Sequence, residues 1–348
     1  MISIMAFPRR GDSYTECFYP ALESLGVKVH EGVFSGRWLL KNLRNIDYLH
    51  MHWPSFFYAS PRPARCLRGF LVFLFLLALA RWRGTRLLWT VHNAWPHDRC
   101  VIPALDVWAR RLVVMLAYRF LVHGSSAEAE ILRIFPRMAG RTVLVDHGHW
   151  IGYYANDITR EAARARLGLA EEDCVFLFIG LCKPYKNLEY LIEAFQRLPA
   201  RATLVIAGKF QDPQYETAIR TAVTRSKARI ALHAGFVPEN EIQTYLKASD
   251  AVVLPYRDVL TSGGAMLALS FGRPVVAPAL GFLKDAVGRD RGILYNPSRP
   301  DGLSEAMAAA MQTHFDESRI LAQVRKHDWT RSARQALAGL GEGAVRPV

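Results

Sequence analysis

Several familiar signatures are missing from this chain of 348 residues, and each absence narrows what the protein can do. Neither a GxxxxGK(S/T) loop nor a GxGxxG fingerprint occurs, which argues against nucleotide hydrolysis and dinucleotide redox chemistry. No DxD sequence is present to hold a divalent metal. No helix-turn-helix, zinc-finger or RNA-recognition signature occurs, so nucleic acid is not an expected partner.

Cysteine is also scarce, and no CxxC pair occurs. The five cysteines are scattered and odd in number: Cys17, Cys66, Cys100, Cys174 and Cys182. They predict a reduced, cytosolic chain with small buried thiols. The apolar start before Arg9 is too short for a signal peptide, so none is expected.

What is present is a repeated strand–turn–helix pattern in a chain with 51% hydrophobic side chains. The strand-like segments 174–180, 203–208 and 251–256 are near-continuous apolar runs, as expected when helices cover both faces of a parallel sheet. The pattern predicts an α/β protein with two doubly wound domains. We expect an N-terminal domain over 1–155, a second domain over 156–315, and a C-terminal helix within 316–348 that packs back towards the first.

The basic excess lies mainly in the first 150 residues, where 19 Lys and Arg face 10 Asp and Glu. There, a dozen apolar residues, Gly69 to Ala80, lie between clusters of arginines. The run is shorter than the ~20 residues that span a bilayer, and it lacks the polar face of an ordinary core helix. It predicts a helix lying in the interface of an anionic membrane, the alternative being a core helix with polar ends. The expected membrane contacts are Arg65, Arg68, Phe70, Phe73, Phe75, Arg81 and Arg83.

A candidate anion site follows two strands of the second half. Lys183 and Lys186 come after strand 174–180, and a helix begins at Ser262-Gly263-Gly264 after strand 251–256. Ligands bind beyond the carboxyl ends of parallel strands, and exposed N–H groups at a helix start suit phosphate. Together these features predict a bound diphosphate. The alternatives are close helix–strand packing for the glycines and a solvated loop for the lysines.

The first half offers candidates for a general base, namely Asp12, His92 and Asp98, each in a loop after a predicted strand. Capping of the next helix is the alternative for Asp12. His50 and His52 form an i,i+2 pair that a strand would place on one face. Because carboxylates are sparse and no cysteine is close, neither a metal site nor a cofactor is expected.

The second half resembles a known family in "FLFIGLCKPYKNLEYLIEAF", "ATLVIAGK", "IALHAGFVPENEIQTYLKASDAVVLPYRDVLTSGGAMLALSFGRPVVAP" and "RGILYNPSRPDGLSEAM". These stretches, over 174–312, resemble the donor-binding domain of GT-B glycosyltransferases. The first half resembles that family through "TVHN" and "HGSSAEAEIL". The length of the chain, the basic apolar segment and "TVHNAWPHD" are similar to those of the glycolipid β-mannosyltransferases of xanthan-type exopolysaccharide assembly.

The resemblance implies two Rossmann-like domains facing a cleft, with the acceptor on the first and a nucleotide sugar on the second. Of the Arg and Lys that hold the diphosphate in the family, the Lys matches Lys186, whereas Leu181 stands at the Arg position and Lys183 compensates. The glycine helix start matches Gly263-Gly264. The implied donor-binding residues are Lys183, Lys186, Phe236, Val237, Tyr256, Thr261, Ser262, Gly263 and Gly264.

One departure from the family concerns two glutamates of many retaining relatives, whose positions fall here on Val259 and Leu267. Their loss favours an inverting, metal-independent transferase, and the closer resemblance implies mannosyl transfer from GDP-mannose to a polyprenyl-diphosphate-linked oligosaccharide. We expect a peripheral enzyme at the cytoplasmic face of the bacterial inner membrane. The alternatives are a retaining transferase with another sugar nucleotide, and a sugar-nucleotide-binding protein or epimerase of the same fold.

Overall fold

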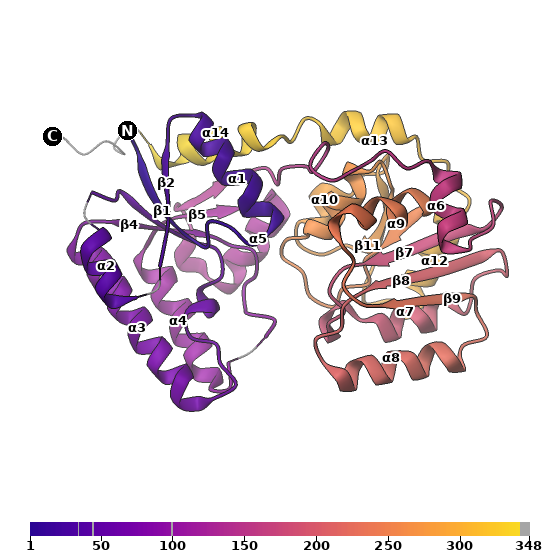
Figure 1. Ribbon diagram of the computed structural model, residues 1–348, viewed down its shortest axis with the longest axis horizontal. Helices are drawn as coiled ribbons and strands as arrows, with labels where there is room; N and C mark the ends of the chain where they lie inside the picture. The colour runs from indigo at the N-terminus through magenta and orange to yellow at the C-terminus, as the bar shows by residue number, and fades with distance from the viewer. Residues whose placement is uncertain (34, 44, 99, 342–348) are drawn as a thin grey trace. The chain divides into compact units, whose positions relative to one another are not determined.

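The computed structural model describes residues 1–33, 35–43, 45–98 and 100–341, and the chain divides into two units (Figure 1). Unit 1 comprises Met1–Gly148 and the segment from His327 onward, and unit 2 comprises His149–Lys326. Each unit contains one six-stranded sheet whose paired strands all run parallel. The predicted pair of doubly wound α/β domains is therefore confirmed.

In unit 1 the strand order is β2-β1-β3-β4-β5-β6. The strands are β1 (Ser3–Phe7), β2 (Lys28–Glu31), β3 (Tyr48–Met51), β4 (Arg86–Thr90), β5 (Ala117–Val122) and β6 (Thr142–Leu144). The helices are α1 (Ser13–Ser24), α2 (Gly36–Asn42), α3 (Pro63–Trp82), α4 (Pro103–Leu116), α5 (Ser125–Ile134) and α14 (Trp329–Leu340), with 3-10 turns η1 (Pro54–Phe57) and η2 (Pro136–Met138).

The core of unit 1 forms where helices pack on this sheet. α1 buries Phe18 and Leu22 in a cluster that also contains Ala333 and Ala336 of α14, so the last described helix packs beside the first (Figure 1). The chain leaves β1 for β2 on one side and returns to β3 on the other. The loops after β1 and β3 therefore diverge at the point where open α/β sheets bind ligands.

In unit 2 the strand order is β12-β11-β10-β7-β8-β9. The strands are β7 (Cys174–Ile179), β8 (Ala202–Gly208), β9 (Ile230–Ala234), β10 (Ala251–Val253), β11 (Val275–Pro278) and β12 (Gly292–Tyr295). The helices are α6 (Arg160–Leu167), α7 (Leu188–Phe195), α8 (Pro213–Arg225), α9 (Ile242–Ala248), α10 (Gly263–Ser270), α11 (Leu283–Ala286), α12 (Gly302–Ala310) and α13 (Glu317–Val324), with 3-10 turns η3 (Pro184–Lys186) and η4 (Glu239–Glu241).

The centre of the unit 2 sheet is apolar on both faces because helices cover both sides, α7 and α8 on one and α9 and α10 on the other (Figure 1). Every residue of β8, β10 and β11 is buried. The strand order reverses between β7 and β10, which pair directly, with Leu177 opposite Val252. The unit therefore has its own switch point between two adjacent strands.

The C-terminal segment differs from the expected single helix. Two helices occur, α13 in unit 2 and α14 in unit 1. Each begins at its own aspartate cap: Asp316 accepts hydrogen bonds from the backbone N–H groups of Ser318 and Arg319, and Asp328 from that of Arg331. The second cap interrupts the helical pattern, because an N-cap residue adopts a non-helical backbone conformation.

Candidate functional site

Lys186 lies at the switch point of unit 2, at the end of the loop that follows β7. Its Nζ is 5.5 Å from the ring centroid of Phe178 and 5.4 Å from that of Tyr256. Burial lowers the pKa of Lys186 to about 8. Gly180 opens the loop with φ +133°, and a Cβ added there would lie 3.3 Å from the lysine Nζ. The ammonium group of this half-buried lysine is partly withdrawn from water, so a bound anion would stabilise its charged form.

The start of α10 lies next to the same tyrosine. Ser262 is the N-cap, and its Oγ accepts a hydrogen bond from the backbone N–H of Ala265 at 3.1 Å. A Cβ added to Gly264 would lie 3.1 Å from Tyr256 Oη, and one added to Gly263 would lie 3.3 Å from the Trp150 ring. Tyr256 thus joins the lysine and the helix start into one site, as the sequence predicted for neighbouring strand ends.

The loops after β7 and β10 are also tied to each other. Arg257 donates from its backbone N–H to the carbonyl of Tyr185 at 2.9 Å, and from its Nε to Asn187 Oδ1 at 2.8 Å. Lys183 is half-buried in the first of these loops. In the second, Thr261 Oγ1 is buried and has no hydrogen-bond partner within the described residues. Cations, a helix N-terminus and a spare hydroxyl therefore face this edge, which is a suitable arrangement for a diphosphate.

Apolar side chains are exposed at the same edge of unit 2. Phe236, in the loop after β9, is 74% exposed, and its neighbour Val237 is half-buried. Leu181 is 42% exposed at the position where the resemblance expects an arginine. A flat aromatic ring open to solvent is available to stack on a base, and the cationic side chains predicted to hold a diphosphate here are those of Lys183 and Lys186.

In unit 1, Asp12 caps α1 after β1. Its carboxylate accepts hydrogen bonds from the backbone N–H groups of Tyr14 and Thr15 and from the hydroxyl of Thr15. Burial raises the pKa of Asp12 in spite of these bonds. The structure therefore shows Asp12 as a helix cap. If Asp12 also acts as a base, the same carboxylate must accept both the capping hydrogen bonds and the proton of the acceptor.

His92 ends a buried chain of hydrogen bonds at the carboxyl edge of the unit 1 sheet. His50 and His52 point to the same side of β3, as their spacing predicted, and both bond to Tyr19 Oη, at 3.0 and 2.7 Å. His50 Nε2 continues to Thr90 Oγ1 at 2.8 Å, and His52 Nδ1 continues to His92 Nε2 at 2.9 Å. Burial lowers the pKa of His50 to about 3 and those of His52 and His92 well below their usual range.

These imidazoles are therefore neutral, and each carries one proton, so when Tyr19 donates to one histidine and accepts from the other, the hydrogen bonds of the chain all point the same way. In one direction Tyr19 donates to His50, His52 donates to Tyr19, and His92 donates from Nε2 to His52. His92 Nδ1 is then left with a lone pair that accepts a proton. In the opposite direction Nδ1 carries a proton and is a donor.

Two further histidines complete a cluster around Tyr14. Its ring centroid lies 4.9 Å from that of His92 and 5.4 Å from those of His123 and His147. Burial lowers the pKa of His123 to about 4 and that of His147 to about 3. Tyr14 Oη and His123 Nε2 are buried without a hydrogen-bond partner in the described chain. The sequence signal for this cluster is the number of histidines at strand ends; nothing in the sequence singles out Tyr14 or Tyr19.

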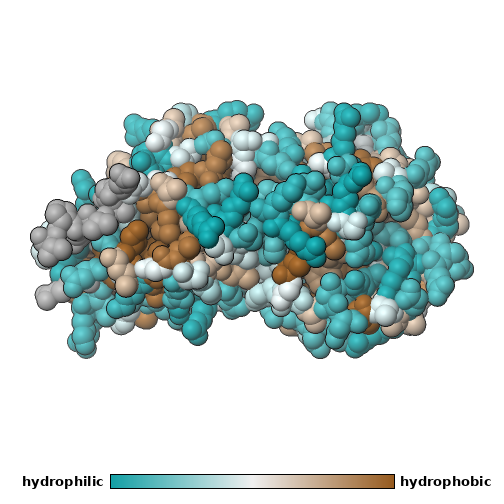
Figure 2. Space-filling model, turned by 90° about the horizontal axis from the view of Figure 1, so that it is seen from above, coloured by the Kyte–Doolittle hydropathy of each residue, from teal (hydrophilic) through white to brown (hydrophobic). Residues whose placement is uncertain are grey.

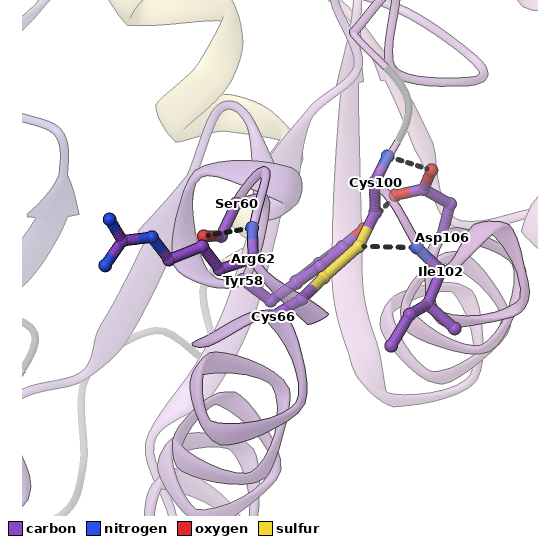
Figure 3. Close-up of a disulfide and its surroundings, with 7 residues drawn as sticks. All are labelled: Tyr58, Ser60, Arg62, Cys66, Cys100, Ile102 and Asp106. Carbon is purple, nitrogen blue, oxygen red and sulfur yellow. Dashed lines mark hydrogen bonds between the residues drawn. A yellow bond between two sulfur atoms is a disulfide. The ribbon is translucent and has the colours of Figure 1, made fainter. Parts of the chain in front are cut away.

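Asp98 is exposed in the loop between β4 and α4, and a disulfide ties the end of this loop to α3. Cys66 and Cys100 form this bond, so the expectation of thiols throughout is wrong for these two cysteines (Figure 3). Asp106 supports the junction by accepting hydrogen bonds from Tyr58 Oη at 2.9 Å and the Cys100 N–H at 3.0 Å. Cysteines that are scattered along a sequence give no signal of their pairing.

Helix α3 has two apolar faces with different surroundings. Phe70 and Phe73 are buried against the aromatic rings of Tyr58 and Phe57, which corrects their expected place at a membrane. Residues four apart share one helix face, and Cys66 and Phe70 belong to the buried one. The opposite face exposes apolar side chains, namely Leu67, Leu71, Phe75 and Trp82.

The exposed face of α3 is unusual for a protein surface. In the face drawn in Figure 2, hydrophilic side chains predominate and hydrophobic ones gather in local patches. A continuous apolar stripe instead marks a contact surface. Within the described residues, α3 is the one helix whose length and composition would allow it to cross a membrane, and 39% of its apolar window is buried. Its 20 residues exceed the apolar run, so length alone does not exclude a span, contrary to the expectation.

Metal ligands do not gather at either site. Among the described residues, no group of three or more His, Cys, Asp or Glu side chains is arranged to hold a metal ion. The chemistry that these side chains offer is anion binding in unit 2 and proton acceptance in unit 1.

Comparison with known proteins identifies the class to which this architecture belongs. Residues 173–313 match the family model of glycosyl transferases group 1. HepE from Anabaena, solved with UDP and glucose, superposes with a TM-score of 0.71 at 16% identity and covers 97% of this chain and 98% of its own. The lipopolysaccharide outer core galactosyltransferase WaaB gives a TM-score of 0.65 at 14% identity, with 97% and 98% coverage. The chain therefore has the GT-B glycosyltransferase fold.

A more particular likeness comes from sequence. The GDP-mannose:glycolipid 4-beta-D-mannosyltransferase of Xanthomonas campestris pv. campestris is 29% identical over 243 residues, which cover 68% of this chain and 62% of the relative. The D-inositol 3-phosphate glycosyltransferase of Jonesia denitrificans is 29% identical over 199 residues, with 53% and 46% covered. The matched part thus spans about three fifths of the first relative's length. These matches support the resemblance read from the sequence.

Proposed function

We propose that the chain is an inverting, metal-independent glycosyltransferase that moves a mannosyl residue from GDP-mannose to a polyprenyl-diphosphate-linked oligosaccharide in exopolysaccharide synthesis. The observation that carries this proposal is the half-buried Lys186 beside Tyr256 and the start of α10, at the switch point of a GT-B fold. The choice of mannose and of a glycolipid acceptor is supported by the two Xanthomonas relatives.

The proposed donor site works by stabilising the leaving diphosphate. Negative charge grows on the phosphate as the bond to the sugar breaks. Lys186 and the N–H groups at the start of α10 are the groups that would receive it, in place of a metal ion. Removing one such preorganised donor typically lowers the rate by about 10²–10³. Phe236 would stack on the nucleobase, and Thr261 would donate its hydroxyl.

Inversion requires one base that takes the proton of the attacking hydroxyl. Of the three candidates, His92 has the arrangement that fits best, because its hydrogen bond to His52 leaves Nδ1 as the acceptor in one direction of the chain. Asp12 is engaged in capping α1, and Asp98 is exposed in its loop. The apolar residues Val259 and Leu267, where many retaining relatives have glutamates, also favour inversion.

The acceptor is proposed to lie in an anionic membrane, with the enzyme held peripherally at the cytoplasmic face of the inner membrane. The apolar stripe of α3 would enter the interface, and Arg65, Arg68, Arg81 and Arg83 would meet lipid phosphates. Replacing Leu71 and Phe75 by serine should release the protein from vesicles containing phosphatidylglycerol, whereas Leu144→Ser, another exposed leucine of unit 1, should not. Unchanged flotation of the double variant would refute this attachment.

The decisive experiment is transfer itself. The protein is incubated with GDP-, UDP- and dTDP-sugars and a lipid-linked oligosaccharide extract, and products are identified by mass and by the anomeric configuration in NMR spectra. We expect a β-mannosyl product from GDP-mannose that forms in the presence of EDTA. An α-linked product would refute the inverting mechanism. Binding or epimerisation of the donor without transfer would refute the proposed transferase activity.

A further inference from the structure

A second charged site occurs in unit 1, at the amino-terminal edge of its sheet, where it is separate from the carboxyl edge that carries Asp12 and His92. A hollow of about 700 Å³ opens between the last turns of α3 and α4 and the first residues of β4 and β5. Its charged lining residues are Arg81, Arg86, Arg119 and Arg141, and none of the described lining residues is Asp or Glu.

The arginines are held in place by aromatic rings and backbone carbonyls. The Arg86 and Arg119 guanidinium carbons lie 4.7 and 4.8 Å from the ring centroid of Tyr118. Arg119 Nε donates to the carbonyl of Gly339 at 3.1 Å, and Arg141 donates to the carbonyls of Ala117 and Val114, both at 2.8 Å. Burial and the neighbouring Arg119 lower the pKa of Arg141. Arg86 also donates from Nη1 to Tyr48 Oη at 3.4 Å, and an arginine has five N–H donors, more than the bonds named here use in Arg119 and Arg141.

A structural role at helix ends accounts for only part of this charge. The C-termini of α3, α4 and α14 lie at these arginines, and each supplies roughly half a negative charge. Four guanidinium groups therefore carry about two and a half positive charges more than the three helix ends offset. An anion in the hollow would balance them, and phosphate oxygens match the planar donor pattern of arginine.

An apolar groove adjoins the hollow. It has a volume of about 660 Å³ and apolar walls that include Trp108, Leu112, Met115, Ile134 and Phe135. Met115 lines both spaces. Arg141 also connects them, since its Nη2 donates to the carbonyls of Val114 and Arg137, which line the groove. A cationic hollow that continues into an apolar groove is complementary to an amphiphile with an anionic head.

We propose that this is a binding site for one anionic phospholipid, with its phosphate among the four arginines and an acyl chain along Met115 and Trp108. The site is separate from the proposed donor and base residues, so it does not depend on glycosyl transfer. It would bind the lipid in the same chemical manner as basic pockets that bind lipid head groups at membrane surfaces.

The test compares soluble ligands on the full chain by isothermal titration calorimetry: dihexanoyl phosphatidylglycerol, dihexanoyl phosphatidylcholine, glycerol 3-phosphate and inorganic phosphate. We expect the wild type to bind the short-chain phosphatidylglycerol more tightly than the other three. The double variant Arg81→Gln/Arg86→Gln should lose about tenfold or more in affinity. Met115→Gln should weaken the lipid but not inorganic phosphate. The matched control is Arg133→Gln, an exposed arginine of α5 outside the hollow.

Each outcome decides the proposal. Equal losses in Arg133→Gln and in the double variant would show a diffuse surface charge and overturn the site. The proposal that the site selects an anionic phospholipid would be refuted if inorganic phosphate bound as tightly as the lipid. It would also be refuted if phosphatidylcholine bound as tightly as phosphatidylglycerol. Thermal melts of every variant establish that it is folded, and GDP-mannose titrations separate this site from the proposed function. Unchanged donor affinity with lost lipid affinity is the expected result.

Discussion

The half-buried Lys186 leads to an unusual prediction: its removal should stabilise the protein while it weakens donor binding. The pKa of this lysine falls from its ordinary 10.5 to about 8 on folding. That difference corresponds to about 3 kcal/mol of cost to the folded state at neutral pH. Lys186→Met keeps most of the apolar stem and removes the charge, so it should raise the melting temperature of unit 2, by roughly 2–4 °C for each kcal/mol.

The pH dependence gives this prediction its sign. Below pH 8 the lysine is charged in both states, and the folded state bears the full cost. Between pH 8 and 10.5 the unfolded state binds more protons, so the wild type gains stability as the pH rises, and the variant does not. The advantage of Lys186→Met should therefore shrink over this range. Differential scanning calorimetry at pH 7 and pH 10 measures it, with the exposed Lys209→Met as control.

Donor binding should change in the opposite direction. A diphosphate binds to the charged lysine, so the donor affinity of the wild type should be greatest below pH 8 and should fall above it. In Lys186→Met the affinity should fall about 100-fold, as for the loss of a buried charge-assisted contact. A variant that melts below the wild type at pH 7 and binds GDP-mannose normally would refute both the burial argument and the assignment of the site.

Further predictions concern the other features of the two units. Gly264→Ala should change stability little and weaken donor binding about tenfold, because its methyl group would lie 3.1 Å from Tyr256 Oη; donor titration and a thermal melt measure both. His52→Phe should lower turnover about tenfold or more with donor affinity unchanged, because it breaks the hydrogen-bond chain to His92; His30→Phe, outside the chain, is the control in steady-state kinetics. Alkylation of the unfolded, unreduced protein should modify three of its five cysteines, Cys17, Cys174 and Cys182, as counted by mass. A count of five would mean that the disulfide is absent. Reduction should cost unit 1 about 4 kcal/mol for a loop of this length, as measured by denaturant unfolding.

The elements that the sequence predicted well are those with a strong local pattern. The apolar strands β7, β8 and β10 lie where continuous hydrophobic runs predicted them, because helices on both faces require such runs. The association of Lys186 with Gly264 also followed from the sequence, since both come after strands that a switch point makes neighbours.

The features that the sequence could not predict depend on tertiary contacts. Phe70 and Leu71 are both apolar and adjacent, and only the packing of α3 on unit 1 decides that the first is buried and the second exposed. The two helices at the C-terminus required a capping aspartate to be recognised within a long helical pattern. The pairing of Cys66 with Cys100 and the role of Tyr19 between two histidines arise from segments far apart in the chain.

The Cys66–Cys100 bond has a mechanical consequence. It joins α3, whose outer face is proposed to enter a lipid surface, to the segment that runs from His92 to Cys100. Because the bond is covalent, a tilt of α3 would also move the loop that carries His92 and Asp98, two of the candidate bases. The hydrogen bonds of Asp106 to Tyr58 and to the Cys100 N–H would remain as a weaker hinge after reduction (Figure 3). Whether the linkage is rigid or hinged is thus set by the redox state of the compartment in which the chain folds.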